Sequence, residues 1–120
     1  MGLANSTTEA YSPDSFVQGG ELVTDHETIS TGQTIAKYSP LGRVTASGEV
    51  IESLPGASDG SQVPIGIAVH DIDTTAGAAD HPVYKGGVFN ADLVAWDASW
   101  TAAQKAGAFD GTPVVLTSPE

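Results

Sequence analysis

The sequence predicts a mainly β protein, a single small domain with one short helix. The chain has 120 residues, which is one domain's worth and enough to bury a core without disulfide bonds. It contains 14 glycines and 7 prolines, so many turns should separate short strands. The clearest strand, residues 63–70, places four branched apolar residues on one face at a period of two: Val63, Ile65, Ile67 and Val69.

The first 20 residues differ in composition from the rest of the chain. They are rich in Ser, Thr, Ala, Gly and Asn, show no sustained apolar period and end in two glycines. We expect residues 1–20 to form a flexible arm and residues 21–120 to form the folded domain. Tyr11 and Phe16 would give the arm apolar groups to bury against a partner, although many chain ends have no such function.

β-prone residues begin at Glu21 and continue through the first half of the domain. Residues 39–42, Ser-Pro-Leu-Gly, match a type I turn because proline takes the second position and glycine the fourth. This turn predicts a hairpin between residues 34–38 and 43–46. Residues 54–62 contain nearly every turn-forming residue type and are expected to form a surface loop.

The second half of the domain should contain more strands and the helix. Residues 82–89 are typical of two strands separated by a Lys-Gly-Gly turn at residues 85–87. Residues 101–106 predict a helix because Thr and Gln have capping-box spacing and the interior is rich in alanine. Residues 113–116, Pro-Val-Val-Leu, follow a turn and should form the closing strand.

The charge of the chain excludes several kinds of partner. Fifteen acidic residues give a formal net charge of -11, so a nucleic acid backbone would be repelled by almost every face. Apolar runs are far shorter than a membrane span requires, so no membrane partner is expected. Only four cations are present: Lys37, Arg43, Lys85 and Lys105.

The candidate catalytic and metal-binding residues are few. His26, His70 and His81 each have an acidic neighbour in sequence, but none has the spacing of a known metal motif. Asp71 and Asp73 would lie on one strand face, where they could share a cation or a proton. Solvated acids at a strand end are the simpler interpretation. We therefore expect no enzyme activity, no metal and no cofactor.

Five segments follow one another along the second half of the chain: Ala57-Ser58-Asp59-Gly60-Ser61-Gln62, Pro64-Ile65-Gly66-Ile67-Ala68, Val83-Tyr84-Lys85-Gly86-Gly87-Val88-Phe89, Leu93-Val94-Ala95-Trp96 and Thr101-Ala102-Ala103-Gln104-Lys105. In their order and spacing these segments resemble the lambda-type head decoration proteins of tailed bacteriophages. The resemblance covers most of the chain, more loosely in its N-terminal half. It implies a β-clip-type domain that forms homotrimers and binds the major capsid protein on the outer surface of the virion.

In this family the trimers sit on the expanded capsid and stabilise it against the pressure of packaged DNA. The resemblance also implies that the N-terminal arm adds a strand to the capsid protein. The arm residues expected to contact the capsid are Thr8, Glu9, Ala10, Tyr11, Ser12 and Phe16. The chain is more acidic than the family leads us to expect, and an outward-facing acidic surface would keep filled heads apart.

An alternative function is a phage-borne β module that binds glycans of the host surface. Trp96 and Trp100 would then be the residues that stack on sugar rings. The simpler interpretation of both tryptophans is packing in a core or an interface.

Overall fold

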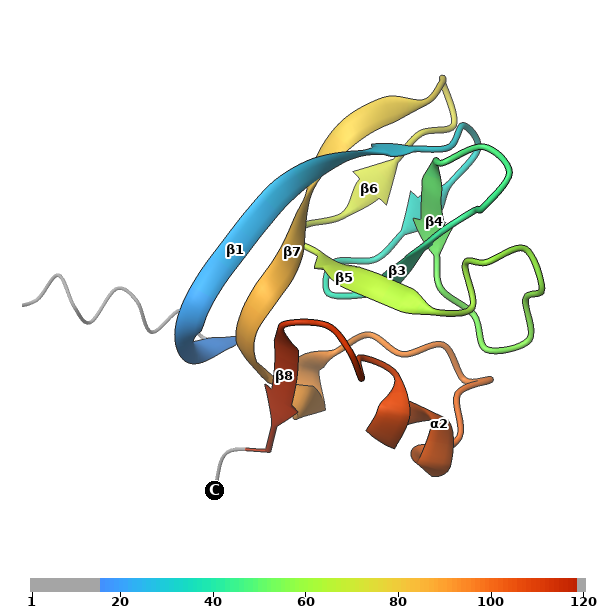
Figure 1. Cartoon of the computed structure of the whole chain (residues 1–120). Helices are drawn as coiled ribbons and strands as arrows, with labels where there is room; N and C mark the ends of the chain where they lie inside the picture. Colours follow the sequence, from blue (N-terminus) through green and yellow to red (C-terminus); the bar gives the residue numbers. More distant parts are fainter. Residues whose placement is uncertain (1–15, 119–120) are drawn as a thin grey trace, which may run out of the picture.

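The computed structural model describes residues 16–118 and places eight strands, a 3₁₀ helix and an α-helix among them (Figure 1). The prediction of a mainly β domain with one short helix is confirmed. The strands are β1 (Val17–Ile29), β2 (Thr34–Ile35), β3 (Pro40–Arg43), β4 (Val50–Glu52), β5 (Pro64–Ala68), β6 (Ile72–Asp73), β7 (Ala79–Asn90) and β8 (Val114–Thr117). The helices are η1 (Ala91–Leu93) and α2 (Ala102–Gly107).

Six strands form one sheet in the order β1-β4-β3-β5-β7-β8, and β1 also pairs with β7. This extra pairing closes five of the strands into a small barrel, and β8 lies outside the closure, parallel to β7. The β1–β7 pair is a long antiparallel ribbon that runs from Val17 opposite Phe89 to Ile29 opposite Ala79 (Figure 1). β2 and β6 pair separately as a short second sheet.

The predicted turn at residues 85–87 is wrong, because β7 runs unbroken through it. The two glycines instead allow the neighbouring strands to approach β7 closely. A Cβ added at Gly86 would lie 3.0 Å from the Cβ of Pro113 and 3.3 Å from Cγ2 of Val23. Gly87 has a φ of 133°, which side chains rarely tolerate. The glycines of this segment therefore serve packing, and the chain does not reverse there.

The predicted turn at residues 39–42 is also wrong, because β3 occupies most of it. The chain turns before β3 instead, between Ala36 and Ser39, where Tyr38 has a left-handed φ of 72°. The turn is closed by a hydrogen bond from the Ser39 amide to the Ala36 carbonyl, 3.2 Å long. Pro40 is tolerated as the first residue of β3. Gly42 is needed inside β3 because a Cβ there would overlap the carbonyl group of Ser61.

Three other predicted elements are confirmed. β5 lies within residues 63–70, β8 covers most of residues 113–116, and α2 begins after Thr101. The capping box of α2 is complete: the Gln104 amide donates to the Thr101 hydroxyl at 3.1 Å, and the Thr101 amide donates to Gln104 Oε1 at 2.8 Å. This cap satisfies amide groups that have no partner within the helix.

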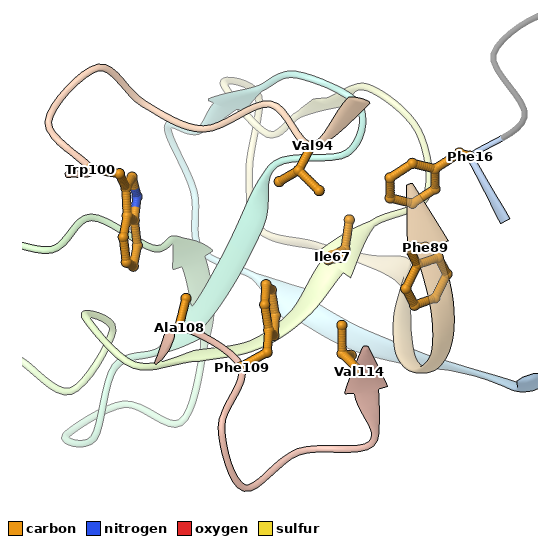
Figure 2. Close-up of a cluster of buried hydrophobic side chains, with 8 residues drawn as sticks. All are labelled: Phe16, Ile67, Phe89, Val94, Trp100, Ala108, Phe109 and Val114. Carbon is orange, nitrogen blue, oxygen red and sulfur yellow. The ribbon is translucent and has the colours of Figure 1, made fainter. Parts of the chain in front are cut away.

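The core consists of two clusters of buried apolar side chains. One fills the barrel beneath β3 and β5, and its members are Ile29, Ile35, Leu41, Val50, Ala68, Ile72 and Val83. The other joins the barrel to the C-terminal third of the chain, and its members are Phe16, Ile67, Phe89, Val94, Trp100, Ala108, Phe109 and Val114 (Figure 2). Helix α2 is attached to this cluster by Ala108 and Phe109, which directly follow the helix and are buried in the cluster.

Candidate functional site

The N-terminal side of the described domain is anchored by Phe16. Its side chain is only 2% exposed and stacks on Tyr38, with 3.8 Å between ring centroids and 11° between ring planes. Phe89 and Tyr84 contribute two more rings, at 5.1 and 5.9 Å from Phe16. The carbonyl of Phe16 accepts a 2.8 Å hydrogen bond from the Asn90 amide. Phe16 is thus part of the second core cluster, in which its ring lies beside that of Phe89 (Figure 2).

The structure describes only one of the six arm residues that were expected to contact the capsid. Thr8, Glu9, Ala10, Tyr11 and Ser12 are outside the described residues, whereas Phe16 is inside the core. Residues 17–20, which were also expected to belong to the arm, form the start of β1. They do so because β7 supplies a pairing partner and the aromatic rings supply an apolar site for Phe16.

β1 presents an open edge and exposed apolar side chains next to this anchor. Among residues 16–118, it pairs with β7 along its length and with β4 only at Ile29. Val17, Leu22 and Val23 are between 40% and 46% exposed. Open strand edges can accept or add another strand, and exposed apolar side chains beside them favour contact with another protein.

A groove of about 950 Å³ lies between η1, α2 and β8. Its apolar lining includes Trp96, Phe109 and Val115, and the Nζ of Lys105 lies 5.9 Å from the centre of the Trp96 ring. Asp92 and Asp110 also line it. Sequence reasoning missed this groove because its walls come from separate segments that no local pattern connects.

The two tryptophans form an edge-to-face pair, with ring centroids 5.0 Å apart and a 61° angle between planes. Trp100 is buried, and its Nε1 donates a 3.2 Å hydrogen bond to the Ser53 carbonyl. Its ring therefore has no open face on which a sugar could stack. Trp96 is partly buried in the wall of the groove, so the glycan-binding alternative is not favoured.

Two of the four cations are held by one carboxylate, Glu27. Arg43 donates to both of its oxygens, at 3.0 and 2.9 Å, and Lys85 donates to Oε2 at 2.6 Å. The hydrogen bond from Arg43 is the main cause that lowers the pKa of Glu27 to about 2; Lys85 adds to it, and burial opposes it. The three side chains join β1, β3 and β7, so they fasten the closure of the barrel.

The histidine and aspartate candidates do not converge on a common point. The Asp71 carboxylate accepts a 2.8 Å hydrogen bond from the Lys37 amide. Asp73 accepts from the amide and the hydroxyl of Thr75, which lower the pKa of its carboxyl. His70 and His81 meet edge to face, with 5.9 Å between centroids. Within residues 16–118, no three His, Asp or Glu side chains gather as metal ligands.

The described helices include none that is long and apolar enough to cross a membrane.

Comparison with known protein families identifies the class of the molecule. The family model of the bacteriophage lambda head decoration protein D matches residues 7–115, which include nearly all of the described domain and all six arm residues expected to contact the capsid. No curated protein matches the chain significantly. The molecule is therefore a structural protein of the phage head that decorates the capsid. The chain belongs to the family of bacteriophage lambda head decoration protein D.

Proposed function

We propose that this chain binds as a homotrimer to the outer surface of the expanded capsid and stabilises the shell against the pressure of packaged DNA. Its partner there is the major capsid protein. The main support is the family match, which spans residues 7–115 and thus includes the segment that the capsid contact requires.

The contact with the capsid is made by residues 8–12, which add a strand to the capsid protein. Main-chain hydrogen bonds supply affinity in such an arrangement, and alternate side chains such as Tyr11 supply specificity. A short segment forms few hydrogen bonds, so three segments held by one trimer gain from their high effective concentration. Phe16 has a different part: its ring stays in the core and fixes the root of the arm.

Co-sedimentation with undecorated capsids, expanded and unexpanded, tests this function. The purified chain should saturate expanded shells and leave unexpanded shells bare. A variant that lacks residues 1–14 should still fold, because it keeps Phe16 and β1, and should fail to bind. The deletion must stop before Phe16, because a chain that starts at Gly20 would lose a buried ring and the start of β1.

Point variants separate the arm from general effects of truncation. Tyr11→Ala should weaken binding to expanded shells, and Ser6→Ala, outside residues 8–12, should not. Normal decoration by the truncated chain would overturn the role of the arm. Failure of the full chain to bind either form of the shell would overturn the proposed function itself.

A further inference from the structure

Two histidines lie opposite each other just beyond the end of the ladder between β5 and β7. That antiparallel ladder pairs Ala68 with Val83. Continued by two residues, the same register sets His70 opposite His81. Opposite residues of an antiparallel pair project from the same face, so the two imidazole rings meet. Their centroids are 5.9 Å apart, and their planes are inclined at 70°.

This separation is close to that of two imidazoles bound to one metal ion. Zinc binds an imidazole nitrogen at about 2.0–2.1 Å, which puts each ring centre about 3.2 Å from the metal. Tetrahedral geometry then sets the two ring centres about 5.2 Å apart. The rings of His70 and His81 need to approach by less than about 1 Å and to turn about χ2, a torsion that is soft in histidine. His70 is exposed and His81 is partly exposed, so both rings have room for this movement.

The hydrogen bonding of His70 prepares one of its ring nitrogens for a metal. Its Nδ1 lies 3.2 Å from the carbonyl oxygen of Asp71. A carbonyl oxygen only accepts, so Nδ1 carries the hydrogen in this contact and Nε2 holds the lone pair that a metal requires. A backbone carbonyl behind the ring also fixes its orientation, as is usual for metal-bound histidines.

The charge around the histidine pair favours a cation. Asp71 directly follows His70, Asp80 directly precedes His81, and the whole chain has a net charge of -11. Both aspartates are held in place by hydrogen bonds to Oδ1: Asp71 accepts from the Lys37 amide at 2.8 Å, and Asp80 accepts from the Thr28 hydroxyl at 2.7 Å. Two fixed negative charges therefore flank the pair.

The pair lies at the end of the β1–β7 ribbon away from Phe16 (Figure 1). On its other side, His81 is opposite Glu27 of β1. The Glu27 carboxylate is already bound by Arg43 and Lys85, so it is not counted as a ligand. An ion at His81 would leave the root of the arm untouched.

We propose that His70 and His81 form a binding site for a divalent transition metal ion of the zinc type, with water molecules completing its coordination. Within residues 16–118 no third His, Asp or Glu joins them as a ligand, so the site is weaker than a structural zinc site with four protein ligands. The ion links β7 to the chain that follows β5, beyond their last paired residues, and thereby stabilises the barrel. The site does not depend on the proposed decoration of the capsid.

Zinc titration of the full chain tests the site. Isothermal titration calorimetry should show one zinc ion per chain, with a Kd below about 1 mM. His70→Asn and His81→Asn should each weaken binding roughly tenfold or more, because each removes one of two protein ligands. His26→Asn is the matched control: in β1 it is the neighbour of Glu27, which is opposite His81, so it projects from the other face of the ribbon.

The control should bind zinc as tightly as the parent. A parent that takes up no zinc below about 1 mM would overturn the proposal, and so would equal weakening by all three substitutions. Near-ultraviolet circular dichroism of the metal-free variants shows whether each of them is folded. His70 and His81 lie outside the buried core clusters, so their substitution should leave the fold intact.

Thermal unfolding with zinc and with magnesium separates the histidine pair from the acidic surface. An ion that binds only the folded chain raises its unfolding temperature. Zinc should do so for the parent and for His26→Asn, and much less for His70→Asn and His81→Asn. Magnesium prefers oxygen ligands, so the same concentration should have little effect on any of them. A zinc effect that magnesium reproduces, or that persists without both histidines, would assign the ion to the acidic surface and refute the site.

Discussion

Phe16 and Tyr38 lie face to face although they come from distant parts of the sequence, with 3.8 Å between ring centroids and 11° between ring planes. The backbone of Tyr38 is itself held by two hydrogen bonds, each 3.0 Å long: its amide donates to the Ala68 carbonyl, and its carbonyl accepts from the Ala95 amide. The left-handed backbone at Tyr38 turns the chain so that the Tyr38 ring covers Phe16.

Phe16→Ala should lower the unfolding free energy of the domain by about 3–5 kcal/mol, since it empties a buried aromatic site. Urea denaturation monitored by tryptophan fluorescence measures the change. Val17→Ala is the control, because that side chain is 40% exposed and should change stability by about 0.5 kcal/mol or less. A loss below about 1 kcal/mol for Phe16→Ala would show that the ring does not anchor the chain.

Stability should fall at acidic pH through Glu27. Its pKa is lowered to about 2 in the folded state from 4.5, so its stabilising effect is complete above pH 4.5. As the pH falls from 4.5 towards 2, the unfolded chain takes up the proton first and the effect is lost. The shift corresponds to at most about 3.4 kcal/mol, and solvent screening at the partly exposed Arg43 should reduce it to about 1–2 kcal/mol.

Urea denaturation of the parent and of Glu27→Gln between pH 7 and pH 2 measures this effect. The difference between their unfolding free energies should be largest near neutral pH and should shrink below pH 4.5. Asp25→Asn, on the exposed part of the same strand, is the control for the loss of one negative charge. A difference that is independent of pH would contradict the assignment to Glu27.

Gly42→Ala should destabilise the domain by about 3 kcal/mol, because the added methyl group meets the backbone of Ser61, which cannot move alone. Gly56→Ala, where nothing lies within 4 Å of the new methyl group, should be nearly neutral. Thermal unfolding by calorimetry measures both. Equal transition temperatures would show that β3 and the loop of Ser61 can separate without loss.

Thr101→Ala should lower the unfolding free energy by about 1 kcal/mol, since it removes the hydroxyl that caps α2. Thr101→Ser keeps this hydroxyl and should restore most of the loss. Chemical denaturation of the two variants gives the comparison. If both lose the same amount, the cap is not the cause.

The elements that could be predicted from the sequence are those determined by local chemistry. The helix followed from Thr101 and Gln104, whose spacing acts within one turn, and β8 followed from a short apolar run after a turn. The two mistaken turns have one common cause. In the sequence, a glycine that forms a turn cannot be distinguished from a glycine that lets a neighbouring chain approach a strand closely. Gly42 and Gly86 are of the second kind, which only the tertiary structure reveals.

The candidate site was less accessible to sequence reasoning. The burial of Phe16 depends on Tyr38 and Phe89, which are remote in sequence, and no apolar period in the sequence around Phe16 indicates it. The groove likewise depends on how α2 and β8 are placed by Phe109 and Val114. Family resemblance could supply the function of the chain because the order of its motifs spans several elements at once.

Asn90 adjoins both ends of the described domain. Its amide binds the carbonyl of Phe16, and in the parallel ladder it is opposite Thr117. A pull on the N-terminal segment would therefore act on three adjacent strands, where β1, β7 and β8 are linked side by side. The load would be shared by the three strands, so β1 would not be peeled away alone. A peptide fused after Ser118 would emerge close to Phe16, where the N-terminal segment joins the domain.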